Sequence, residues 1–197
     1  MAGDWVQGPA GNDTLTNNGT IYGNLLGDYL QRLGVDPTQT AGQDSISNYG
    51  LVDGDIYGDY VIFYPLFAPF REVYTGEGAS DTITNSGTVG GAIYAEGGDD
   101  TVILQDGANG GDDNTLPIDG GTGTDTLRFE FPMDEATINA INSANPANDS
   151  ITINGHTFTF TNFEVLEAVS SLECPDGTTG DDVIVCAVSP PVGTNTD

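Results

Sequence analysis

The segment from Gly120 to Arg128 has the residue types and spacing best suited to metal chemistry. It reads G-G-T-G-T-D-T-L-R and fits the pattern G-G-x-G-x-D-x-U-x, with U an apolar residue, at every fixed position. Glycines such as Gly121 and Gly123 let backbone carbonyls turn toward an ion, and Asp125 supplies a carboxylate. A ligand set made only of oxygen atoms favours a hard cation, so we expect Ca²⁺ to bind here.

Three sixteen-residue segments, 13–28, 44–59 and 81–96, align without a gap. Aligned positions keep their chemistry, because three columns are always aliphatic, one is always Asn and two are always Gly. A single copy cannot bury its apolar side, whereas copies stacked in register form a continuous core. The columns are Leu15/Ile46/Ile83, Ile21/Val52/Val89, Leu25/Ile56/Ile93, Asn17/Asn48/Asn85, Gly19/Gly50/Gly87 and Gly23/Gly54/Gly91.

The same register stacks acidic residues, with Asp13, Asp44 and Asp81 in one column and Asp28, Asp59 and Glu96 in another. Unit charges about 5 Å apart repel by about 1–3 kcal/mol, depending on the local dielectric. A bound divalent ion reverses that sign; alternatively, each Asp hydrogen-bonds its own turn. The expected metal ligands are Asp99, Asp100, Asp119, Gly121, Gly123, Asp125, Asp13, Asp44, Asp81, Asp181 and Asp182.

The elements expected to position these residues are short strands. The opening Asp-[Ser/Thr]-aliphatic marks strand starts at Asp13, Asp44, Asp81, Asp100, Asp125 and Asp149, with a looser copy at Asp182. Segment 134–142 predicts a short helix or a turn-rich insert. Segments 150–155 and 156–161 alternate about an Asn-Gly turn and predict a β-hairpin, followed by a strand over 163–167.

Two insertions, 29–37 and 60–70, leave the repeat at the same point, so we expect both on one side of the fold. The role of the apolar insert 60–74 has two readings: a lid on the stack, or a surface for a partner.

These patterns predict an all-β fold, a right-handed parallel β-solenoid (β-helix or β-roll) with loop insertions. We expect a solenoid repeat domain over 1–128, its continuation with the hairpin over 129–188, and a linker or tail over 189–197. Cys174 and Cys186 predict a local disulfide in an exported protein, with two free thiols as the alternative.

Composition excludes several functions. The formal net charge is −27, with three Arg and no Lys, which opposes binding to nucleic acid and to anionic membranes. No apolar run is long enough to span a membrane. The sequence shows no nucleophile elbow, phosphate loop or zinc motif, and His156 lies in an alternating Thr/Phe strand pattern. We therefore expect no enzymatic activity and no catalytic residue.

The nonapeptide resembles the hemolysin-type (RTX) calcium-binding repeats, and the sixteen-residue copies resemble passenger repeats of bacterial autotransporters and large adhesins. The resemblance implies a parallel β-helix or β-roll, export and attachment at the cell surface. We expect a secreted, calcium-stabilised structural or adhesive module. Its partners would be other copies, joined head to tail or by strand addition into fibres, neighbouring domains of a longer chain, or a glycan or other surface ligand. Alternatives are a glycan-binding or glycan-acting domain of the lyase or epimerase kind, and an ice-binding face of Thr and Ser.

Overall fold

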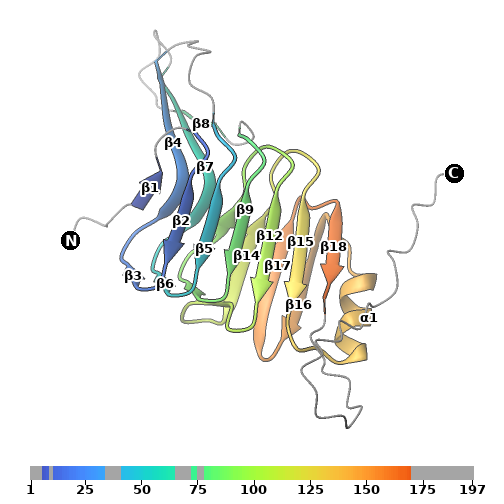
Figure 1. The fold of residues 1–197 in the computed structure, drawn as a ribbon. Coiled ribbons are helices and arrows are strands. Elements are labelled where there is room, and N and C mark those ends of the chain that lie inside the picture. Colours follow the sequence, from blue (N-terminus) through green and yellow to red (C-terminus); the bar gives the residue numbers. More distant parts are fainter. Residues whose placement is uncertain (1–5, 9–10, 34–40, 65–71, 75–77, 170–197) are drawn as a thin grey trace, which may run out of the picture.

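The computed structural model describes residues 6–8, 11–33, 41–64, 72–74 and 78–169, and it is mostly β (Figure 1). Sheet A has the order β1 (Val6–Gly8), β4 (Leu25–Leu33), β7 (Ile56–Tyr64), β11 (Ile93–Tyr94), β14 (Thr115–Asp119), β17 (His156–Thr161) and β16 (Asn148–Ile153), and β8 (Glu72–Tyr74) pairs with β7. Sheet B has the order β2 (Thr14–Asn17), β5 (Ser45–Asn48), β9 (Thr82–Asn85), β12 (Thr101–Gln105), β15 (Thr126–Glu130) and β18 (Val165–Ala168). Sheet C has the order β3 (Thr20–Ile21), β6 (Leu51–Val52), β10 (Thr88–Val89) and β13 (Asn109–Gly110).

The chain visits the three sheets in turn, and each circuit forms one coil. β2, β3 and β4 make the first coil, and their counterparts in the next coils pair with them in parallel. Leu15 pairs with Ile46 and Ile46 with Ile83, which confirms the register expected from the repeat. The prediction that equivalent segments stack on one another is therefore confirmed.

One apolar core runs through the whole stack. The aliphatic columns face inward, and the core continues from Ile21 in the first coil to Phe163 near the last described strand. Aromatic residues fill its later part, where Phe129 packs against Phe131, Phe158 and Phe160. The core crosses residue 128 without interruption, because β15 spans it.

A buried ladder of asparagines ties the first three coils together. Nδ2 of Asn17 donates to Oδ1 of Asn48, and Nδ2 of Asn48 donates to Oδ1 of Asn85, each at 2.8 Å. Oδ1 of each Asn also accepts from the backbone N–H of the glycine two residues later. These corners stack so closely that a Cβ on Gly50 would collide with the carbonyl oxygen of Gly19. The Asn column and the Gly19/Gly50/Gly87 column are therefore two parts of one corner.

Both insertions begin as extensions of sheet A. β4 and β7 continue past Asp28 and Asp59, and their extensions pair in register from Tyr29–Tyr60 to Leu33–Tyr64. β8 adds to β7 antiparallel. The extended strands rise together beyond the stack (Figure 1), so both insertions leave on the same side, as expected.

The later part of the chain closes one end of the stack. The helix α1 (Glu135–Ser143) is capped by Asp134, whose Oδ1 accepts from the N–H of Thr137, and it buries Ile138 and Ile141 in the core. β16 and β17 form the expected hairpin, with positive φ at Asn154 and Gly155 as a type I′ turn requires. Within the described ranges, no helix has the length and hydropathy of a membrane span.

We predict that Asn48→Ala destabilises the protein by about 2–4 kcal/mol, because it leaves the amides of Asn17 and Asn85 without their buried partner. The free energy of unfolding in urea measures this. Asn139→Ala, on the exposed face of α1, is the matched control and should change stability by less than about 0.5 kcal/mol. Equal effects of the two substitutions would show that the ladder contributes nothing.

Candidate metal centre

One column of aspartates runs along the corner where sheet B begins, and we call it the first acid row. Each member after the first accepts, at Oδ1, the backbone N–H of the member one coil earlier, at 2.7–2.8 Å. The last N–H of the row donates to Oε2 of Glu164. The row consists of Asp13, Asp44, Asp81, Asp100 and Asp125.

Asp28 and Asp59, at the end of the coil portion of sheet A, form a second acid row facing the first. Oδ2 of Asp28 accepts from the N–H of Gly42, and Oδ2 of Asp59 accepts from the N–H of Ala79. The rows approach closely because glycine precedes each of these acids. A Cβ on Gly27 would collide with the carboxylate of Asp44, as one on Gly58 would with that of Asp81.

Asp13, Asp28 and Asp44 form the tightest part of the paired rows. Each offers one carboxylate oxygen, and these oxygens all lie within 4.8 Å of one another. Two oxygens that bind the same Ca²⁺ at about 2.4 Å lie at most about 4.8 Å apart. The three carboxylates are therefore close enough together to share one ion.

One oxygen of every carboxylate in the two rows is buried and lacks a hydrogen-bond partner within the described structure. Asp28 and Asp125 are fully buried, and Asp59 is 1% exposed. A buried, ionised oxygen without a partner is costly, so such a group keeps a proton or meets a cation. The unpartnered atoms are Oδ2 of Asp13, Asp44, Asp81, Asp100 and Asp125, and Oδ1 of Asp28 and Asp59.

Burial and mutual repulsion raise the pKa values of the carboxyls of Asp28, Asp44, Asp59, Asp81, Asp100 and Asp125 in the metal-free protein. Burial, reinforced by neighbouring carboxylates, raises the pKa of Asp59 and of Asp81 to about 8. The same causes raise the pKa of Asp100 to about 7 and those of Asp44 and Asp125 to about 6. A cation placed among them would favour the ionised forms.

A shallow hollow gives solvent access to the corner. It has a volume of about 490 Å³ and borders Asp13, Asp44 and Asp81 of the first acid row, together with the exposed Asp99. The hollow therefore brings solvent to these three members of the first acid row.

The nonapeptide loop stacks on the loop 96–100 of the preceding coil. Gly97 bridges to Thr122, and Oδ1 of Asp99 accepts from the N–H of Thr124. Gly121 and Gly123 have φ of 92° and 148°, and a Cβ on Gly123 would collide with the carbonyl oxygen of Gly98. The glycines serve the turn and the stacking of the two loops.

Only some of the expected ligands belong to the rows. Asp119 lies two residues before the position that matches Glu96, and its Oδ1 accepts from the N–H of Gly121 and from Nδ2 of Asn162. Asp149 lies at the start of a strand, as expected, but this strand is β16, which pairs antiparallel with β17 and does not begin a coil. Four expected residues, Asp181, Asp182, Cys174 and Cys186, lie outside the described residues.

Asp28 and Asp59 were not among the expected ligands, although their sequence column was visible. These two acids face the first acid row because the chain bends between the end of a sheet A strand and the start of the next sheet B strand, and the sequence column does not specify this bend. The Leu-Gly-Asp and Tyr-Gly-Asp sequences at 26–28 and 57–59 were the available signal, because glycine next to a stacked acid allows this close approach.

The hydroxyl face of sheet B is less regular than the acid rows. One column of five hydroxyls runs from Thr14 to Thr126. The neighbouring column, Thr16, Ser47 and Thr84, continues into Ile103 and Arg128. A double hydroxyl row is therefore three coils deep.

Comparison of the chain with protein-family models and with curated protein sequences finds no match.

We predict that the metal-free protein loses stability as pH rises from about 4 to about 8. Unfolded Asp ionises near 3.8, whereas folded Asp59 and Asp81 hold their protons to about 8, so the folded state binds more protons across this window. Below the window both states are protonated and the effect is fully retained. Within this window, each such carboxyl lowers the free energy of unfolding by on the order of 1 kcal/mol per pH unit. Urea unfolding in chelator at several pH values measures this slope.

Asp81→Asn should flatten the slope, whereas Asp53→Asn, an equal charge change at an exposed position, should leave it nearly unchanged. If the two variants gave the same slope, general repulsion among surface charges, and not burial of the acid rows, would cause the pH dependence.

Proposed function

We propose that this chain is an extracellular structural module, a right-handed β-solenoid whose paired acid rows bind Ca²⁺. The ions neutralise carboxylates that stacking forces together and so hold successive coils in register. The observation that carries the proposal is the set of buried, unpartnered carboxylate oxygens in two facing rows.

The chemistry of the donors favours calcium over other common metals. The rows offer carboxylate oxygens, and no His or Cys belongs to the described cluster, which argues against zinc. Calcium accepts irregular sets of oxygen ligands, whereas Mg²⁺ demands near-ideal octahedral geometry and gives up its water reluctantly. A corner built from stacked aspartates and backbone turns suits the more adaptable ion.

An extracellular location agrees with this chemistry. Calcium sites of extracellular modules bind with dissociation constants of about 10⁻⁴–10⁻³ M, so such modules are filled only where calcium is abundant. The strongly negative chain also gains most from a medium rich in cations. Right-handed winding is the expected hand, because connections between parallel strands of one sheet are nearly always right-handed.

The two ends of the stack differ, which bears on assembly. Among the described strands, β2 and β3 are the edge strands of sheets B and C at the first coil, and such edges can accept another strand. At the other end α1 packs beside β18 over the end of the core (Figure 1). We therefore propose that growth by strand addition, into fibres or onto a neighbouring domain, uses the β2 end.

We predict that calcium raises the melting temperature by at least about 4 °C at pH 7.5, which corresponds to about 1–2 kcal/mol for a chain of this size. Magnesium at equal concentration should give a smaller rise. Differential scanning calorimetry with calcium, with magnesium and with chelator measures both. An unchanged melting temperature in calcium would defeat the proposal.

The substitution Asp44→Asn separates the metal effect from ordinary stability. It keeps an Oδ1 acceptor for the N–H of Asp13 but removes a charge from the Asp13–Asp28–Asp44 cluster. We predict that this variant is more stable than the parent in chelator and gains less from calcium. Asp53→Asn should respond to calcium as the parent does, because Asp53 is exposed and outside both rows.

A further inference from the structure

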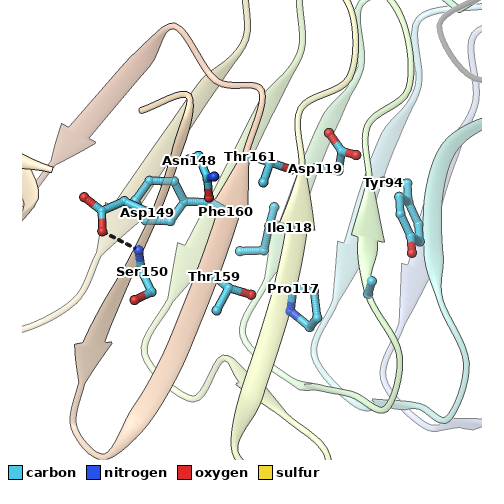
Figure 2. Close-up of a pocket in the computed structure, with 11 residues that line it drawn as sticks. Tyr94, Pro117, Ile118, Asp119, Asn148, Asp149, Ser150, Thr159, Phe160 and Thr161 are labelled. Atoms are coloured by element: carbon cyan, nitrogen blue, oxygen red, sulfur yellow. Dashed lines mark hydrogen bonds between the residues drawn. The ribbon is translucent and has the colours of Figure 1, made fainter. Parts of the chain in front are cut away.

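The outer face of sheet A carries a second feature, separate from the acid rows. A hollow of about 480 Å³ lies over β11, β14, β17 and β16. Figure 2 shows Tyr94 at one end of it, Asn148, Asp149 and Ser150 at the other, and Pro117 and Thr159 between them. We call this hollow the sheet A groove.

The groove has an aromatic wall. The ring of Tyr94 stacks on that of Tyr57, with centroids 5.1 Å apart and planes 16° from parallel. Because β11 lies between β7 and β14, Tyr57 covers one face of Tyr94 and the other face is directed toward β14 and the groove. The hydroxyl of Tyr57 donates to Asp55, which helps to fix this pair. The wall is therefore held in place before any ligand arrives.

Polar groups lie in one row across the sheet from this ring. Tyr94 pairs with Asp119, Asp119 with Thr161, and Thr161 with Asn148. Asp119 is held in place by the N–H of Gly121 and by Nδ2 of Asn162, and both of these bonds end on Oδ1. Thr161 and Asn148 add groups that both donate and accept.

The charge of the groove restricts the ligand. None of the described residues that line it is positively charged, whereas Asp119 and Asp149 are acidic. An anionic ligand would therefore be repelled. A flat aromatic face packs against the C–H side of a sugar ring, and carboxylate and amide groups bind its hydroxyls strongly.

We propose that the sheet A groove binds a short neutral oligosaccharide, with a sugar ring on the free face of Tyr94. The distance from β11 to β16 covers three strand spacings, about 14 Å, so the row from Tyr94 to Asn148 can contact more than one sugar unit. The ligand extends across the strands, and Asp119 accepts from hydroxyls of the unit next to the ring. This site does not depend on the proposed role of the acid rows.

The test is NMR titration of the full chain, at one fixed calcium concentration, with cellotriose, maltotriose, chitotriose and the acidic trigalacturonate. We expect at least one neutral trisaccharide to shift the amide signals of the residues that line the groove, and the acidic one to shift none of them. Absence of groove shifts with all three neutral sugars would overturn the proposal, as would equal shifts with trigalacturonate.

Variants locate the binding. Tyr94→Ala should weaken the affinity for the bound sugar at least about tenfold, whereas Tyr22→Ala, which removes a tyrosine that is 66% exposed at a turn, should not change it. Ser150→Gln, at an exposed position on the edge strand, places a longer side chain in the groove and should also weaken binding. This second variant keeps the test valid if Tyr94→Ala does not fold. Unchanged affinity in Ser150→Gln and in a folded Tyr94→Ala would contradict the proposal.

Discussion

Aspartates of successive coils stand one strand spacing apart inside the protein, and the rest of the structure accommodates this spacing. Parallel strands about 4.8 Å apart carry the carboxylates with them, because side chains in register follow their backbones. Asp44, for example, lies between Asp13 and Asp81 in its own row and beside Asp28 in the other. Repulsion of this kind persists unless protons or cations remove the charge.

The backbone is organised around these carboxylates. From Asp44 onward in the first acid row, Oδ1 accepts an N–H from the previous coil, so each of these carboxylates connects two coils, as the asparagine ladder does at another corner. The two ladders differ in whether all their polar side-chain atoms have hydrogen-bond partners. The side-chain amide of Asn48 accepts from Asn17 and donates to Asn85. Each Asp of the acid rows, in contrast, keeps one oxygen that accepts no hydrogen bond within the described structure. The asparagine corner therefore needs no ligand, whereas the unpartnered aspartate oxygens need a proton or a cation to offset their burial.

Much of this arrangement was predictable from sequence, because stacking in register follows from aliphatic, Asn and Gly columns that repeat without gaps. The Asn154-Gly155 turn also predicted its hairpin correctly, since both residues adopt positive φ. The facing of Asp28 toward Asp44 depends on how the chain bends between sheets A and B, which no local pattern specifies. The sheet A groove was not predictable for a similar reason: Tyr94 and Asn148 are far apart in sequence and meet only through strand order.

Anomalous diffraction from crystals grown in calcium would locate an ion held between the two acid rows. We expect anomalous density within about 2.3–2.6 Å of carboxylate oxygens of Asp13, Asp28 and Asp44, between the two acid rows. Density only beside exposed acids such as Asp112, with none between the rows, would contradict it.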